Sequence, residues 1–426
     1  MSITNSTIEL GSDAIATVQV ARQPILGAGP RHQLLGYQLL FSDTGGLFDA
    51  FDEVDDQRAT TEVLGHTVLT LGIDSVVGNH LAFVTFPRQQ VIEYVPLVLP
   101  PAQSVIQLGR DAWAEGDTEV VASRCAEYRR LGYRITLTDF VPHLADSPLL
   151  SHADFVSLDV VGQSEAQLRA AVAAASPHDA EVIAAGVDTA AHRDLAVAAG
   201  VDHLHGYFFS APHVVAGRDL PGFKLAYLQL LRAAYREDVD FDELAEIIKQ
   251  DVALSYKLLK FINSAHFGLR GRIESVQRAL TMLGLQQIRS WVGVATVSGL
   301  VDPRPQELAV LAATRARFCE ALGRRLRLAT PHECFSLGMF SLLDVLLGTT
   351  LEEALADVPL TDAVRDALHG EPGPLADLLV VVVAYERGQW DTVTRLSGLH
   401  GWSETELIGS YIDAIEWSRD FFGSVA

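Results

Sequence analysis

The first half of the chain alternates between short apolar segments and helical segments, and this alternation constrains the fold most strongly. The apolar segments are rich in β-branched and aromatic residues and are bounded by Gly, Pro and Asp, which is typical of buried strands. Strands are expected at residues 18–25, 81–86, 104–109, 133–140, 155–161, 181–187 and 203–209. Strand–helix alternation sustained over about 200 residues predicts a parallel sheet that closes into an α/β barrel of the TIM type.

The pattern changes near the middle of the chain. Residues 214–222 lie in a stretch rich in Pro and Gly and are expected to form a linker. From residue 223 to 426, apolar residues recur at three- and four-residue spacing, which predicts an all-α domain. The barrel domain would span 18–213, after an N-terminal extension at 1–17. The expected helices include 225–235, 241–251, 253–264, 273–283, 286–300, 307–326 and 334–347.

The charge balance excludes several classes of partner. The chain has 54 acidic and 32 basic residues, a formal net charge of −22. Sequence-independent nucleic-acid binding needs clustered Lys and Arg, and docking on an anionic membrane needs the same. We therefore expect neither partner. No apolar stretch reaches the roughly 20 residues that span a bilayer, and the first residues do not resemble a secretion signal. We therefore expect a cytoplasmic protein. Cys125, Cys319 and Cys334 have no CxxC spacing and are odd in number, so we expect reduced thiols.

In a parallel barrel the chemistry lies at the C-terminal ends of the strands, so the residues at these ends indicate function. Most of them are neutral and short, and two are carboxylates. They are Gln38, Thr85, Gln107, Thr138, Asp139, Ser157, Asp159 and Ala185.

Four segments of this half resemble an EAL domain. They are RQPILG with LLGYQLLF, ADFVSLDV, VIAAGVDTAAHRDLAVAAGVDHL and HGYFFSAP, the last being the most specific. In that family a TIM-like barrel hydrolyses cyclic di-GMP with metal ions. The resemblance covers residues 18–213 and implies the same fold.

The resemblance also places the functional positions of the family on this chain. The Glu of the EAL signature falls on Gln38, and the Arg that follows it, which contacts substrate phosphate, falls on Ser42. The metal-ligating Asn falls on Thr85. The next ligand, a Glu, falls on Gln107.

The remaining positions are altered in the same way. The aspartates of the DDF motif fall on Thr138 and Asp139, so the first is lost. The Lys and Asp of KxD fall on Ser157 and Asp159, and a later Glu falls on Ala185.

These replacements remove most of the charged oxygens that a metal site needs. Magnesium and manganese require several oxygen ligands, carboxylates foremost. Without a two-metal clamp nothing lowers the pKa of the attacking water. We therefore expect no metal, no cofactor and no enzymatic activity. Asp139 and Asp159 are either ligand contacts or carboxylates that cap a strand end or helix.

The second half resembles an HDOD domain, most clearly over residues 242–292. HDOD domains are relatives of the HD phosphohydrolases that lack the metal-binding His–Asp pair. Ser341 and Leu342 stand at the expected His and Asp positions, with a lone Asp344 nearby. His332, Glu333 and Cys334 are adjacent, but three adjacent side chains rarely point at one ion. The EAL-then-HDOD order and the segment AYERGQW together resemble a family of two-domain bacterial signalling proteins.

Two functions are expected from this combination. The first is a non-enzymatic adaptor that binds a protein partner such as a sensor kinase or a diguanylate cyclase, with a homo-oligomer left open. The alternative is a receptor that binds cyclic di-GMP or another nucleotide without hydrolysis. Phe267, Trp291, Trp390 and Trp417 are candidates for an interface or for the core. A hydrolase with an unusual metal site is a third reading.

Overall fold

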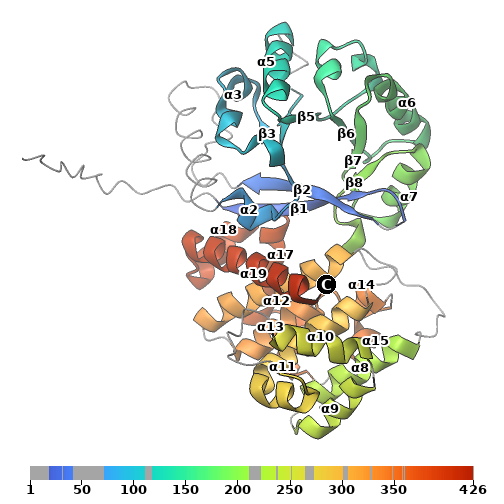
Figure 1. The fold of residues 1–426 in the computed structure, drawn as a ribbon. Helices are drawn as coiled ribbons and strands as arrows, with labels where there is room; N and C mark the ends of the chain where they lie inside the picture. The colour runs from blue at the N-terminus through green and yellow to red at the C-terminus, as the bar shows by residue number, and fades with distance from the viewer. Residues whose placement is uncertain are drawn as a thin grey trace, which may run out of the picture.

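The computed structural model describes most of the chain, and it shows a strand-rich part above a helical part (Figure 1). The described residues are 19–30, 32–41, 72–110, 118–210, 222–236, 238–250, 252–263, 273–300, 306–326, 329–347, 349–356, 358 and 360–425. The expected extension 1–17 and all of the expected linker except Gly222 lie outside these residues. So do Ser42 and Phe267.

The strand-rich part is a closed eight-stranded barrel. Its strands are β1 (Val20–Gly27), β2 (Leu34–Phe41), β3 (Leu81–Phe86), β4 (Ser104–Leu108), β5 (Arg134–Leu137), β6 (Phe155–Asp159), β7 (Glu181–Ala185) and β8 (His203–His205). This confirms the predicted barrel but corrects the expectation of a wholly parallel sheet. β1 runs antiparallel to both β2 and β8. The connection from Gly27 to Leu34 is too short for a crossover helix, so it makes a hairpin.

Helices that precede or follow the strands from β3 onward cover the outside of the barrel. They are α2 (Ile73–Val77), α3 (Arg88–Ile92), α5 (Thr118–Arg130), α6 (Glu165–Ala175) and α7 (Ala190–Ala199). Ser164 and Gln167 form a capping box that begins α6. Gly200 ends α7 in the left-handed conformation, which glycine adopts without a steric penalty. These local signals set where α6 begins and where α7 ends.

The lumen of the barrel has an apolar layer. Its side chains come from alternate positions of five strands, as the two-residue period of a strand requires. They are Ile25, Phe83, Val105, Phe155 and Ile183. Two residues further along β3 and β4, the inward positions are the polar Thr85 and Gln107. The apolar layer therefore forms a floor beneath a polar mouth.

The second part contains helices and no strand among its described residues, as predicted. Its helices are α8 (Gly222–Tyr235), α9 (Phe241–Lys249), α10 (Val252–Ile262), α11 (Val276–Leu300), α12 (Gln306–Leu326), α13 (Pro331–Phe340), α14 (Leu343–Leu347), α15 (Leu351–Leu355), α16 (Asp362–Leu368), α17 (Pro374–Glu386), α18 (Trp390–His400) and α19 (Glu404–Val425). Asp240 caps α9, and Gly284 interrupts α11 with a positive φ. Each described helix is too short or too polar to cross a membrane.

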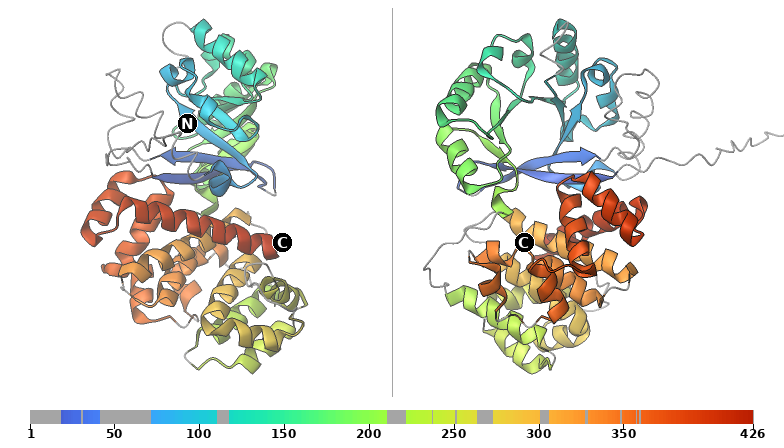
Figure 2. Two further views of the ribbon diagram at one scale, coloured as in Figure 1. Left: turned by 60° about the vertical axis from the view of Figure 1, so that its left-hand side comes forward. Right: turned by 180° about the vertical axis from the view of Figure 1, so that it is seen from behind.

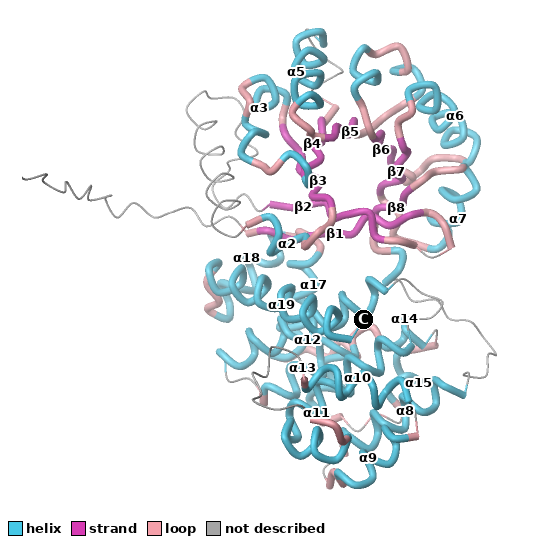
Figure 3. The backbone as a smooth tube through the Cα atoms, in the orientation of Figure 1, coloured by secondary structure: helices cyan, strands magenta, loops and turns pink. Residues whose placement is uncertain are grey.

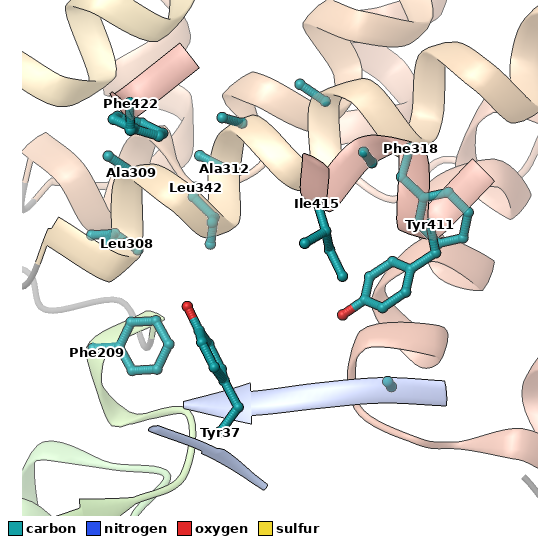
Figure 4. Close-up of a cluster of buried hydrophobic side chains, with 14 of the residues drawn as sticks. Tyr37, Phe209, Leu308, Ala309, Ala312, Phe318, Leu342, Tyr411, Ile415 and Phe422 are labelled. Carbon is teal, nitrogen blue, oxygen red and sulfur yellow. The ribbon is translucent and has the colours of Figure 1, made fainter. Parts of the chain in front are cut away.

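The helical part covers the face of the barrel that the β1–β2 hairpin presents (Figure 2). α17 packs on β1, and α19 packs on α2. The backbone tube shows the boundary between strands and helices at this hairpin (Figure 3). Tyr37 of β2 and Phe209 point toward Leu308 of α12 (Figure 4). One continuous apolar core therefore runs through both parts of the protein.

Candidate functional site

The barrel mouth brings most of the predicted site residues together. Thr85 and Gln107 are register partners on β3 and β4, and the Thr85 hydroxyl donates a hydrogen bond of 3.3 Å to Gln107 Oε1. Asp159 and Ala185 are register partners on β6 and β7. Gln38 lies on β2 beside Phe83 of β3. These side chains and Ser157 stand at the same end of neighbouring strands, as the barrel topology requires.

The polar residues at the ends of β5 and β6 have roles in the geometry of the backbone. The Thr138 hydroxyl donates to the carbonyl of Leu108 at 3.2 Å. Asp139 has a φ of 54°, in the left-handed region where Asp is one of the few tolerated residues. Asp159 Oδ1 accepts a hydrogen bond of 2.9 Å from the amide of Val161. Both aspartates thus have a structural use at strand ends, and the Asp159 side chain remains exposed.

The residues of this mouth do not match a pair of divalent cations. Among the described residues, no group of three or more His, Cys, Asp and Glu side chains is placed to hold a metal ion. The mouth offers amide and hydroxyl oxygens, with Asp139 and Asp159 as its carboxylates. Magnesium and manganese need more negative oxygen ligands than this set provides. We derive no metal-dependent step from it.

A cavity of about 770 Å³ opens from the mouth toward the helical part. Gln38 and Thr85 line it on the barrel side, together with Arg88, which begins α3. Arg387 and Trp390 line it from the helical part, at the turn between α17 and α18. Sequence reasoning missed both arginines. The segment AYERGQW was the only available signal for Arg387, and nothing in the chain near Arg88 marks it as a site residue.

Residues 206–210 of the segment GYFFSAP connect the lumen to the helical part. Burial lowers the pKa of His205, at the base of the mouth, to about 4, so its imidazole is neutral at pH 7. The hydroxyl of Tyr207 donates a hydrogen bond to the backbone carbonyl of Glu386. The guanidinium of Arg387 lies 5.1 Å from the centroid of the Tyr207 ring. The most specific motif of the barrel therefore makes a contact between the two parts.

A buried ion pair lies beside the position where a metal-binding His would stand in the helical part. Arg315 of α12 and Glu386 of α17 approach to 2.8 Å, with side chains 6% and 3% exposed. The Arg315 Nη1 also donates to the Ser341 hydroxyl at 2.9 Å. Leu342 is buried in the core, and Asp344 lies in the first turn of α14. A guanidinium group thus supplies the positive charge next to Ser341.

The adjacent residues His332, Glu333 and Cys334 do not converge. The His332 ring packs against Tyr235, with centroids 5.0 Å apart, and burial lowers its pKa to about 4. Glu333 completes the capping box of α13 with Thr330. Cys334 is buried and free, as are the other two cysteines. Trp291 is fully buried, whereas Trp390 and Trp417 are partly exposed.

Comparisons with known protein families match both parts of the chain. The EAL domain matches residues 85–212, and the HDOD domain matches residues 220–360. The uncharacterized protein YuxH of Bacillus subtilis is 30% identical over 95% of this chain and 98% of its own length. The protein CdgJ of Vibrio cholerae, named a cyclic di-GMP phosphodiesterase, is 32% identical over 96% of this chain and 94% of its own length.

Solved structures of EAL proteins are also similar to this chain. The PaMucR phosphodiesterase, in complex with c-di-GMP, has a TM-score of 0.38 and 17% identity, covering 49% of this chain and 99% of that chain. An EAL domain protein from Listeria monocytogenes has a TM-score of 0.37 and 18% identity, covering 48% of this chain and 94% of that chain.

The relative from Vibrio cholerae corrects one prediction. The replacements at Gln38, Thr85, Gln107, Thr138, Ser157 and Ala185 led to the expectation that the chain is not an enzyme. A relative that aligns with nearly the whole chain is named a phosphodiesterase. That expectation was therefore wrong, because it rested on the altered ligand positions of this chain alone.

Proposed function

Because the chain belongs to the family of signalling proteins that join an EAL domain to an HDOD domain, we propose that it acts in cyclic di-GMP signalling by binding the cyclic dinucleotide at its barrel mouth. Binding is the step that signal reception and hydrolysis have in common. We therefore propose binding, and hydrolysis of the cyclic dinucleotide is measured on the same samples.

The cavity at the mouth is the observation that carries this proposal. Its volume of about 770 Å³ is in the range of small-molecule sites. Arg88 and Arg387 place two guanidinium groups on its wall, although the whole chain carries a net charge of −22. Guanidinium groups pair with phosphate oxygens through two parallel hydrogen bonds. Phe41 and Trp390 add aromatic surface on which a base can stack.

Calorimetric titration of the full chain with cyclic di-GMP tests the proposal. We expect a Kd in the low micromolar range or below, roughly −8 kcal/mol or better. Arg88→Gln should weaken binding about tenfold, since it removes one charge-assisted contact. Arg169→Gln is the matched control, because Arg169 pairs with Glu165 on the exposed face of α6. Absence of binding by the wild-type chain would contradict the proposal.

The same samples are assayed for the linear dinucleotide product with magnesium and with manganese present. Formation of product identifies the bound ligand as a substrate, and its absence identifies the site as a receptor site. Either result is compatible with binding at the mouth. The two results differ in what the protein does to the signal.

A protein partner is our second proposal, and exposed apolar side chains on the helical part favour it. Tyr256 of α10 is 61% exposed, and Met282 and Leu285 of α11 are 48% and 36% exposed. The two helices pack on each other. A partner of the sensor-kinase or diguanylate-cyclase class would cover such side chains. When Tyr256, Met282 and Leu285 are all replaced by Ser, the partner should no longer co-purify with the tagged full chain. Unchanged co-purification would rule this surface out.

A further inference from the structure

The turn between α17 and α18 is attached to the barrel on both sides of Arg387. The backbone carbonyl of Glu386 accepts the hydrogen bond from Tyr207. Gly388, with a φ of 65°, lies so close to Leu40 of β2 that a Cβ atom would come within 2.9 Å of Leu40 Cδ1. A residue with a side chain would be strained there, because the positive φ favours glycine. The position of the turn relative to the barrel mouth is therefore well defined.

The two cavity-lining side chains of this turn are held by aromatic neighbours. The Arg387 guanidinium lies over the Tyr207 ring, while the side chain remains exposed toward the cavity. Trp390 meets the Tyr385 ring edge-on, with centroids 5.3 Å apart. A charged group held by an aromatic ring loses less side-chain entropy when it binds a ligand. Both residues are thus oriented before any ligand arrives.

We infer that this turn is the second wall of the ligand site, so that a cyclic dinucleotide bound at the barrel mouth contacts both domains at once. This inference rests on the proposed function and assigns roles within its site. Arg387 is the partner of a phosphate oxygen, opposite Arg88, and Trp390 is the apolar wall against a base. Gln38, Thr85 and Arg88 on the barrel form the other wall of the site.

A ligand that contacts both domains couples its binding to their docking. It binds the docked arrangement more tightly than a separated one, because Arg387 and Trp390 are in reach only when the domains are docked. Linkage then requires that the ligand stabilise docking by the same factor by which docking strengthens ligand binding. Ligand binding therefore affects the helical domain by changing the stability of its contact with the barrel.

Titrations of the full chain with cyclic di-GMP test this inference with three matched variants. Arg387→Gln should bind about tenfold more weakly than the wild type, because a charge-assisted contact is lost. Arg387→Lys keeps the positive charge but loses the two parallel hydrogen bonds of a guanidinium, so it should bind more weakly than the wild type and more tightly than Arg387→Gln. Arg395→Gln makes the same charge change on the exposed face of α18, away from the cavity, and should leave the Kd unchanged.

The outcomes separate this inference from the proposed function. One outcome overturns the inference and leaves the proposed function standing. In it the wild type binds and Arg88→Gln binds more weakly, but Arg387→Gln binds within about twofold of the wild type, a difference of about 0.4 kcal/mol. No binding by the wild type overturns both. Melting temperatures of Arg387→Gln and Arg395→Gln are compared without ligand. Agreement within about 2 °C assigns the lost affinity to the contact between Arg387 and the ligand. Equally weak binding by Arg387→Lys and Arg387→Gln, with normal melting, would show that the positive charge contributes nothing and would overturn the phosphate contact.

Discussion

The hydroxyl of Tyr37, on barrel strand β2, donates a hydrogen bond of 2.8 Å to Oε1 of Glu307, on helix α12. Both side chains are buried, and the guanidinium of Arg22 lies 4.3 Å from the Tyr37 ring centroid. Apolar side chains, among them Leu308 and Phe209, also lie close by (Figure 4). A polar contact in apolar surroundings specifies one relative arrangement of two surfaces, because any shift leaves a buried group unpaired.

Tyr37→Phe should weaken the contact between the two domains. The buried Glu307 carboxylate would lose a hydrogen-bond donor, which costs about 1–3 kcal/mol. Urea unfolding of the full chain, followed by circular dichroism, measures the change in the free energy of unfolding. Tyr256→Phe is the control, since that side chain is 61% exposed. Equal stabilities for the two variants would show that the Tyr37 hydrogen bond contributes nothing.

The buried pair of Arg315 and Glu386 should behave non-additively. Glu386→Met leaves the Arg315 charge buried beside Ser341 without its carboxylate, and we expect a loss of about 3–5 kcal/mol. The double variant with Arg315→Met removes both charges and should recover most of that loss. A double-mutant cycle on unfolding free energies measures the coupling. Additive losses would mean that the two side chains act independently.

Gly338 of α13 should not tolerate a methyl group. A Cβ atom at this position would lie 2.6 Å from Ala316 Cα in α12, and the helix backbone cannot move aside as a side chain can. Gly338→Ala should therefore cost about 1–3 kcal/mol through overpacking. Gly409→Ala in α19 has open space around it and should stabilise the helix by about 0.5–1 kcal/mol. The paired change in melting temperature tests the sign of both effects.

His205 should make the stability of the protein depend on pH. Burial lowers its pKa to about 4, whereas the imidazole of an unfolded chain titrates near 6.5. Between these values the unfolded chain binds more protons than the folded one, so stability falls as the pH drops from about 6.5 to about 4. The contribution is about 3 kcal/mol across this window.

His205→Gln removes the titrating group and should flatten this part of the pH profile. Urea midpoints at pH 7, 6, 5 and 4.5 measure the slope for both proteins. A parallel decline in the variant and the wild type would assign the acid sensitivity to other groups. Asp188, whose charge favours the protonated imidazole, is the neighbour that limits the size of the effect.

The sequence by itself determined the elements whose causes are local. The strands of the barrel from β3 to β8 follow from short runs of β-branched and aromatic residues. Caps at Ser164, Gly200 and Asp240 begin or end helices through contacts within a few residues. The break in α11 at Gly284 has the same local origin. These features need no knowledge of the remainder of the chain.

Only the tertiary structure decided which distant residues meet. Arg88 and Arg387 line one cavity although 299 positions separate them, and Tyr37 and Glu307 are 270 positions apart. The antiparallel β1 was missed because β2 was not among the expected strands, and its hairpin sets the direction of the first strand. Such pairings depend on how whole surfaces pack and on which buried polar groups find partners. A local pattern of residues carries neither kind of information, because both are properties of the folded chain.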